Sequence, residues 1–164
     1  MSLKTRYLAI AGRIRRELQE LNQVVERALH IWQEGTAKAA VDDYYVDAVA
    51  LNLHSFYSGI ERLLEIIADG IDETKPSGSS WHQELLRQLA TDIPGIRPAA
   101  ISIESRELLD RYRGFRHVVR NVYTFNLDPE QIELLIKHLQ LTMTQTKQEL
   151  LVFADWLEQL ASGD

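Results

Sequence analysis

The sequence predicts an all-α protein, an up-and-down helical bundle of four long helices plus one shorter helix. Apolar residues recur at three- and four-residue steps through most of the 164 residues, which is the pattern of helices with one buried face. Clusters of Gly, Pro, Ser and Asp separate these stretches, and strand-like alternation is almost absent. Because the connections are short, we expect neighbouring helices to pack against one another in a single domain covering residues 1–164.

The first two predicted helices are long and are joined by a tight turn. The first covers about residues 3–34 and stops at Gly35-Thr36. Its apolar face contains Leu18, Leu21, Val25, Leu29 and Trp32. The second covers about residues 37–69, with Gly70 as its C-terminal cap, because glycine readily adopts the left-handed conformation that ends a helix. Residues 72–79 form the clearest loop, since they are rich in Ser, Pro and Gly.

The shorter predicted helix follows this loop. Ser80 and Gln83 form a capping-box pattern, in which each side chain bonds to the backbone of the other end of the first turn. The helix is expected to end near Thr91. Pro94-Gly95 and Pro98 then break the chain before the next helix.

The last two predicted helices begin at side chains that favour helix starts. Ser102 is expected to cap a helix that ends near Phe125. Asp128 precedes Pro129, and proline at the first helical position is a strong start signal. This last helix continues to about Leu160.

Composition and charge limit the function classes. The hydrophobic fraction of 45% and charged fraction of 26% are those of an ordinary soluble protein. A net charge of −6 argues against a general nucleic-acid coating protein, so any anion site must be local. The absence of cysteine excludes disulfides and thiolate metal sites. Without a membrane-length apolar run or a secretory signal pattern, we expect a cytoplasmic protein that makes no membrane contact.

Residues 111–123 carry the most informative pattern in the chain. On a helix with about 100° per residue, their apolar side chains fall on one side. The opposite side, here called the cationic face, carries Arg113, Arg116, His117, Arg120 and Tyr123. Guanidinium groups bind phosphate, and an imidazole transfers protons near neutral pH. The cationic face is therefore a candidate phosphate-binding and proton-transfer site.

Two interpretations of the cationic face remain open. It is either a solvated basic face near a helix C-terminus, where the helix dipole favours cations, or a site for an anion. Arginines at 113, 116 and 120 place like charges close together, which costs stability unless something anionic meets them. No acidic residue occurs between Asp110 and Asp128, so we expect no pairing within this helix. The second interpretation then requires a neutralising group from elsewhere.

The second helix offers such groups on its polar face. That face carries Asp47, His54, Ser58, Glu61 and Glu65. One interpretation is a solvated face with ion pairs to Arg113 and Arg120, each worth under about 1 kcal/mol. The other is that His54 and Glu61 orient the cationic face. A carboxylate that fixes one arginine leaves its neighbours available for a substrate phosphate.

The remaining chemically distinctive residues fit ordinary structural roles. His82 and His138 are interpreted as helix residues without metal-ligand spacing. The three tryptophans are interpreted as core or interface anchors; they are Trp32, Trp81 and Trp156. The chain has no phosphate-binding glycine loop and no nucleophile elbow. We therefore expect no metal and no cofactor, and metal-dependent or nucleotide-hydrolysing enzymes fit poorly.

The sequence resembles a known family over most of its length. Residues 115–123, Phe-Arg-His-Val-Val-Arg-Asn-Val-Tyr, followed by Leu-Asp-Pro at 127–129, are similar to HepT-like members of the HEPN superfamily. Residues 54–61 and 81–86 also look like that group. These proteins are small helical toxins of prokaryotic toxin–antitoxin pairs, so the resemblance implies a HEPN-like helical fold.

The superfamily motif is Arg, a polar residue, three more residues and then His, with Tyr often two positions later. In this chain Arg116 and His117 match the first two positions, and Tyr123 matches the tyrosine. The histidine position is Asn121, and an amide cannot transfer a proton as imidazole does. Either His117, with Arg116 and Arg120, takes over this role, or this copy cleaves slowly or not at all.

The resemblance implies metal-independent ribonuclease action, in which the ribose 2′-OH attacks the adjacent phosphate and arginines stabilise the developing charge. It also implies a homodimer in which two arginine-bearing helices face a shared cleft. The usual partner is a minimal nucleotidyltransferase antitoxin that adds adenylate to the motif tyrosine, here Tyr123. The added charge and bulk would block RNA.

Three functions follow from these observations. The first is a HepT-like toxin component that cleaves or binds RNA and is neutralised by a nucleotidyltransferase. The second is a catalytically silent HEPN bundle that binds a protein partner or a nucleotide. The third is a structural helical bundle whose basic face binds an acidic partner.

Overall fold

A computed structural model describes residues 1–38, 42–123 and 126–163. Within these ranges it contains α1 (Leu3–Ala37), α2 (Tyr44–Ile67), the π-helical turn η1 (Ala68–Asp72), α3 (Trp81–Leu89), α4 (Ile103–Asn121) and α5 (Pro129–Ser162). The β-structure of the described residues is one isolated bridge between Ile93 and Arg97. The predicted all-α class is confirmed, with four long helices and one short one. None of these helices has both the length and the hydrophobicity needed to span a membrane.

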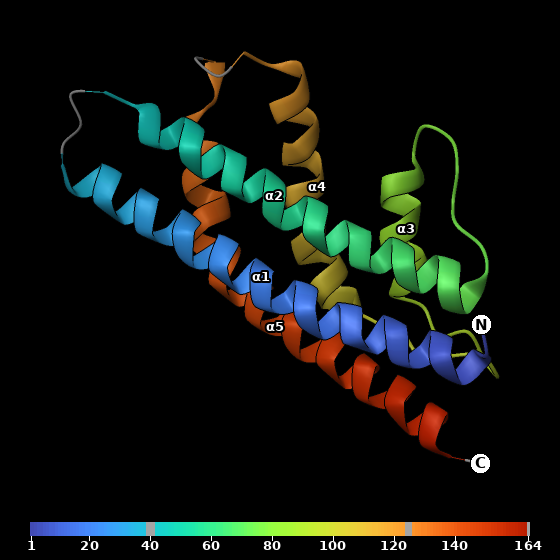
Figure 1. Ribbon diagram of the computed structural model, residues 1–164. Coiled ribbons are helices and arrows are strands. Elements are labelled where there is room, and N and C mark those ends of the chain that lie inside the picture. The colour runs from blue at the N-terminus through green and yellow to red at the C-terminus, as the bar shows by residue number, and fades with distance from the viewer. Residues whose placement is uncertain (39–41, 124–125, 164) are drawn as a thin grey trace.

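The three longest helices lie side by side (Figure 1). α1 packs against both α2 and α5. It runs antiparallel to each of them, so the two ends of the chain lie at the same end of the bundle. α4 crosses α2 at a steep angle, and α3 packs against α2 and α4. α2 therefore packs against both the other long helices and the α3–α4 pair.

The core lies between α1, α2 and α5 and extends under α4. Leu18, Leu53 and Leu64 are almost completely buried, as expected for residues at helical spacing on facing helices. α1 and α2 approach closely at Gly59, where a Cβ atom would lie 2.5 Å from Leu21 Cδ2. α4 is tied to α5 by Tyr112, whose hydroxyl donates to the Leu135 carbonyl oxygen at 2.6 Å.

The predicted turn between the first two helices is wrong by several residues. α1 continues through Gly35 to Ala37, and α2 begins only at Tyr44, not at residue 37. Gly35 does not break the helix; its missing side chain makes room for Tyr45, whose Cγ would lie 2.2 Å from a Cβ atom there. Residues 39–41, part of the expected start of the second helix, lie outside the described residues.

The predicted cap at Gly70 is also wrong. Gly70 lies inside η1, and a Cβ atom there would be 2.5 Å from Ile10 Cδ1. This glycine therefore permits close packing of η1 against α1. The chain leaves the helix at Glu73, which has the left-handed conformation with φ 54°.

The shorter helix forms without the predicted capping box. α3 starts at Trp81, but the Ser80 side chain makes no capping hydrogen bond. Instead, the Ser80 carbonyl oxygen accepts from the Glu84 backbone N–H at 3.1 Å. The helix ends at Leu89, two residues before the expected Thr91.

The starts of the last two helices are confirmed. The Ser102 hydroxyl accepts from the Ser105 backbone N–H at 3.0 Å, and Asp128 accepts from the backbone N–H of Glu130 at 3.0 Å. α4 ends at Asn121, earlier than predicted, and the expected end at Phe125 lies outside the described residues. α5 runs two residues past the predicted end.

Candidate functional site

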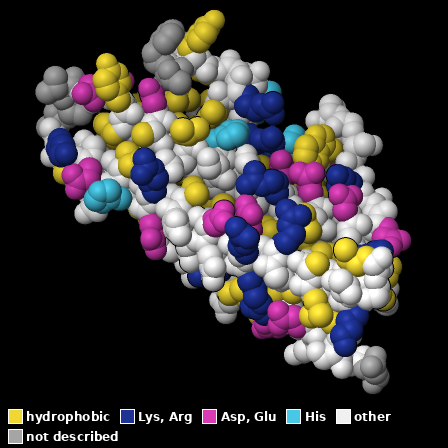
Figure 2. All heavy atoms as spheres, in the orientation of Figure 1, with side chains coloured by type: hydrophobic (Ala, Val, Ile, Leu, Met, Phe, Trp, Pro, Cys, Tyr) yellow, Lys and Arg dark blue, Asp and Glu magenta, His cyan; other side chains and the backbone are white. Residues whose placement is uncertain are grey.

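The cationic face of α4 borders a pocket at the start of α3. This basic pocket has a volume of about 270 Å³ and is lined by Ser79, Ser80, His82, Gln83, Arg113, Arg116, His117 and Arg120. On the face drawn in Figure 2, Lys, Arg and His side chains lie close together, with Asp and Glu side chains beside them. The structure thus brings four of the predicted site residues to one pocket. Asn121 and Tyr123 are not among its lining residues.

A second pocket lies on the α2 side of Arg116. This α2 pocket has a volume of about 540 Å³ and is lined by His54, Ser55, Ser58, Glu61, Arg62, Glu65, Trp81 and Arg116. Arg116 lines both pockets, so its side chain stands where they meet. The predicted supporting residues His54 and Glu61 line this second pocket together with Arg116.

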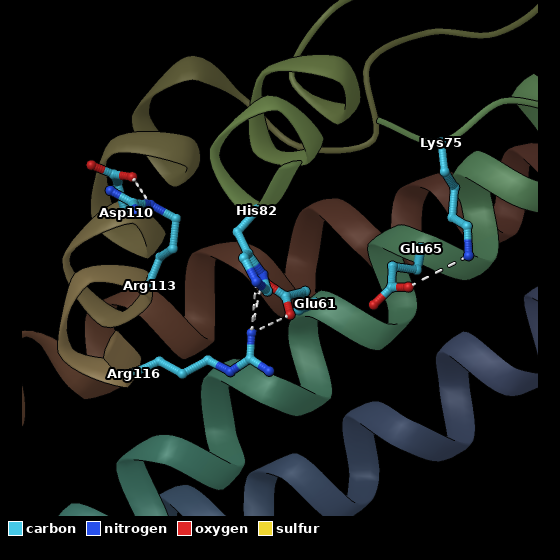
Figure 3. Close-up of polar contacts among 7 residues, drawn as sticks. All are labelled: Glu61, Glu65, Lys75, His82, Asp110, Arg113 and Arg116. Carbon is cyan, nitrogen blue, oxygen red and sulfur yellow. Dashed lines mark hydrogen bonds and ion pairs between the residues drawn. The ribbon is translucent and has the colours of Figure 1, made fainter. Parts of the chain in front are cut away.

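Glu61 anchors the central arginine. Arg116 Nη1 donates to Glu61 Oε1 at 2.9 Å, and the second carboxylate oxygen lies 2.7 Å from His82 Nδ1. The Glu61 side chain is only 4% exposed. Figure 3 shows Arg116 reaching from α4 toward Glu61 on α2 and His82 on α3. One buried carboxylate therefore holds side chains from two other helices, and we call this the Arg116–Glu61–His82 cluster.

The interpretation of His82 as an ordinary helix residue is wrong. A carboxylate only accepts hydrogen bonds, so the 2.7 Å contact to Glu61 places a proton on His82 Nδ1. Arg116 Nη1 is 3.0 Å from Nδ1 and 3.4 Å from Nε2. An atom at these two distances in the plane of the imidazole would collide with Cε1, the carbon between the two nitrogens. Arg116 Nη1 therefore lies over the face of the His82 ring. The Trp81 ring also packs on His82, with centroids 3.6 Å apart.

The expectation that α4 has no internal ion pair is wrong for one arginine. Arg113 Nε donates to Asp110 Oδ1 at 2.6 Å, one helical turn earlier (Figure 3). The Asp110 side chain is 43% exposed, so this pair is at the surface. Arg120 is exposed and makes no ion pair within the part of the chain that the structure describes.

The other motif residues lie at the exposed end of α4. Asn121 Nδ2 donates to the backbone oxygen of His117 at 2.7 Å and lies 3.3 Å from its Nδ1. The asparagine amide therefore folds back on its own helix. Tyr123 follows the last helical turn and is 75% exposed as a residue.

Buried side-chain atoms without a hydrogen-bond partner among the described residues lie where the two pockets meet. Among the described residues, five buried side-chain atoms have no hydrogen-bond partner. Three of them belong to this region: Tyr57 Oη, Ser58 Oγ and Arg116 Nε. Burial, reinforced by the Glu61 carboxylate, raises the pKa of the Tyr57 phenol far above its usual value. Buried polar groups are normally satisfied, so these atoms give the surroundings of Arg116 hydrogen-bonding capacity that the contacts of the described residues do not use.

The positive charges of the cationic face affect the pKa of His54 on α2. Burial lowers the pKa of the His54 imidazole, and the Arg116 and Arg120 charges lower it further. Glu61 acts in the opposite direction without reversing the shift. His54 is therefore a neutral imidazole at neutral pH. It lines the α2 pocket and not the basic pocket.

The chemistry of the basic pocket is that of an anion site. Three guanidinium groups converge on it, and one of them is fixed by a buried carboxylate. Guanidinium N–H groups match the oxygens of a phosphate. Among the described residues, no group of three or more His, Cys, Asp and Glu side chains is arranged to hold a metal ion.

A family model described as HepT-like protein matches residues 48–157, about two thirds of the chain. The matched range runs from α2 to near the end of α5 and contains every residue of the two pockets. No match was found among curated proteins or among solved structures.

Proposed function

Since the chain belongs to the family of HepT-like proteins, we propose that it is a toxin component that acts on RNA at the basic pocket. The observation that carries this proposal is the Arg116 guanidinium, which is anchored by buried Glu61 and flanked by two further arginines in one pocket. An anchored arginine has little rotational freedom left to lose, so binding a phosphate costs less. The flanking side chains of Arg113 and Arg120 then meet neighbouring phosphates.

RNA binding of this kind is compatible with an acidic protein. Although the net charge is −6, a concave site lined by one sign of charge focuses its field locally. Two copies facing each other across their α4 helices would double the positive charge in one cleft. We therefore include a homodimer in the proposal, acting in the cytoplasm, where RNA is present.

The proposed reaction is metal-independent cleavage. The ribose 2′-oxygen attacks the adjacent phosphorus as the bond to the 5′-oxygen breaks, giving a cyclic phosphate and a free 5′-hydroxyl. Arg116 and Arg120 stabilise the charge that builds on the phosphorus oxygens. Of the motif residues, His117 carries an imidazole, whereas Asn121 cannot accept the proton.

The proposed regulator is a minimal nucleotidyltransferase antitoxin. Tyr123 is accessible to such an enzyme because the residue is 75% exposed. An adenylate there adds negative charge and bulk three residues after Arg120 of the basic pocket and would repel RNA. Mass spectrometry of the chain co-expressed with a neighbouring nucleotidyltransferase should show an adenylate on Tyr123 that is absent from Tyr123→Phe. An unmodified Tyr123 peptide would contradict this regulation.

The test of the function uses purified protein, tRNA or mRNA, and a chelator. We expect cleavage, and a loss of about 100-fold or more in Arg116→Ala, because that arginine contacts the reacting phosphate. Arg16→Ala is the matched control, since Arg16 is 84% exposed on α1; it should cleave normally. If RNA stays intact at a high concentration of the wild-type protein, the proposed ribonuclease activity is rejected.

One observation favours a second function, an RNA-binding module that does not cleave. Asn121 occupies the motif histidine position, and its amide is bonded to its own helix. Such a module binds RNA with strong salt dependence and leaves it intact. Asn121→His should then introduce cleavage. A monomer in light scattering would contradict the dimeric cleft in either version.

A further inference from the structure

We propose that His82, rather than a residue of the α4 motif, is the general base that removes the proton from the ribose 2′-hydroxyl, and that Glu61 positions it. This inference rests on the proposed ribonuclease function. It assigns the proton transfer to a residue on α3, outside the arginine motif. It also explains how a chain with an amide at position 121 would retain cleavage.

The first support is the state of the His82 ring. Its Nδ1–H donates to Glu61 Oε2 at 2.7 Å, so the basic nitrogen is Nε2. A carboxylate bonded to one ring nitrogen fixes the tautomer and stabilises the imidazolium that forms when the other nitrogen takes a proton. Glu61 is 4% exposed, so water competes little for this contact.

The second support is the position of the ring. His82 lines the basic pocket together with the three arginines. Its side chain is 26% exposed, and the Trp81 ring packs against it. The imidazole is thus held in place by Trp81 and Glu61, yet it is open to a ligand in the basic pocket.

The other two histidines near the site lack this arrangement. His117 is exposed, and its ring contact within the described residues is to the Asn121 amide at 3.3 Å. His54 is neutral, but it lines the α2 pocket and not the basic pocket. Of the three, His82 alone combines a carboxylate partner with a place in the basic pocket, as far as the described residues extend. An oriented base next to an anion site is the geometry that general base catalysis requires.

The Arg116–Glu61–His82 cluster also couples the two tasks of the site. The same carboxylate holds the arginine that binds the phosphate and the imidazole that takes the proton. The 2′-oxygen is close to the phosphorus that it attacks, so base and phosphate ligand must lie side by side. Fixing both to Glu61 preserves that proximity when RNA enters.

The proposed step is balanced. The 2′-hydroxyl proton passes to His82 Nε2 as the 2′-oxygen bonds to phosphorus. The bond from phosphorus to the 5′-oxygen breaks, and this oxygen takes a proton from water. The imidazolium then neutralises the hydroxide left behind, so the enzyme returns to its starting state.

The test compares single-turnover cleavage and RNA binding in His82 variants. His82→Asn retains a donor toward Glu61 but has no basic nitrogen. We expect it to lose about 10²–10⁴-fold in cleavage rate while its RNA affinity stays near that of the wild type. His82→Gln, which places its amide near the Nε2 position, provides a second folded variant. Added imidazole should partly restore cleavage by His82→Ala, which a purely structural role would not allow.

Two controls separate the possible outcomes. His138→Asn changes a half-buried histidine on α5 and should cleave normally, and His117→Asn should lose less than His82→Asn. If His82→Asn cleaves normally while Arg116→Ala does not, the role of His82 is overturned and the ribonuclease stands. If the wild type binds RNA without cutting it, both the cleavage and the role of His82 are overturned, and the RNA-binding module remains.

Discussion

The guanidinium groups of Arg97 and Arg116 each contact a buried carboxylate, but they differ in how many of their five N–H donors are occupied. Arg97 donates through Nε and Nη2 to Asp72, and the side chains are 0% and 1% exposed. Its other donors go to the backbone oxygens of Thr91, Pro98 and Gln88. With every donor occupied, Arg97 fastens η1, α3 and the following loop together.

Arg116 is held by a similar carboxylate but keeps unused donors. Nη1 donates to Glu61, whereas Nε is buried without a hydrogen-bond partner among the described residues. The side chain is 19% exposed and lines two pockets. Burial beside a carboxylate is therefore common to both arginines. The unoccupied donors of Arg116 are what distinguish it from Arg97.

The largest expected effect tests this distinction through stability. Asp72→Ala leaves a fully buried, unpaired Arg97, so the free energy of unfolding should fall by about 3–5 kcal/mol. Glu61→Ala should cost less, because Arg116 can turn toward the solvent of the adjoining pockets. Urea unfolding of both variants measures the difference. Equal losses would show that Arg116 is as structural as Arg97.

The second prediction concerns pH. The lowered pKa of His54 means that the unfolded chain binds more protons than the folded one below the ordinary value of 6.5. Stability from this group is therefore complete above pH 6.5 and declines as the pH falls through that value toward the folded pKa. Since Arg116 contributes to the shift, Arg116→Gln should raise the His54 pKa and make this decline shallower.

NMR titration of the His54 ring provides the measurement. Arg16→Gln removes the same charge on α1 and should leave the His54 pKa unchanged. An unchanged pKa in Arg116→Gln would mean that burial and Arg120 produce the shift without Arg116. Glu61 would then neutralise the charge of Arg116 so fully that it has no effect on the His54 pKa, as expected for a fully paired arginine.

Only some of the residues around Arg97 and Arg116 could be predicted from the sequence. Which ones depends on how far apart the contacting residues lie in the chain. Arg113, Arg116 and Arg120 lie on one helix, so helical spacing places them on one face. His82 is 21 residues from Glu61, and Arg97 is 25 residues from Asp72; no periodicity links such pairs. The patterns of the two helices therefore predicted the three arginines and Glu61 as the carboxylate that fixes one of them, but not His82 or the Arg97–Asp72 pair.

The wrong helix ends have a related cause. Glycine is expected to stop a helix because of its conformational freedom. At Gly35 and Gly70 the missing side chain instead admits Tyr45 and Ile10 from other helices. Such a contact depends on which elements pack together, and a single stretch of sequence does not contain that information.

The smallest expected effect involves Arg113. Its partner Asp110 is more exposed than Asp72 and Glu61, the carboxylates that pair with Arg97 and Arg116. Asp110 is 43% exposed, so Asp110→Asn should change stability by less than about 1 kcal/mol. It releases Arg113 for one more phosphate contact, which should steepen the salt dependence of RNA binding, log Kd against log salt, by about 0.7 for a single strand. Asp155→Asn, which removes one of the two carboxylates paired with Arg15 on the α1–α5 surface, is the control with the same charge change. Equal steepening in both variants would trace the effect to net charge. Steepening in Asp110→Asn alone would show that the exposed Asp110 carboxylate, rather than the net charge, limits how far Arg113 is available to RNA.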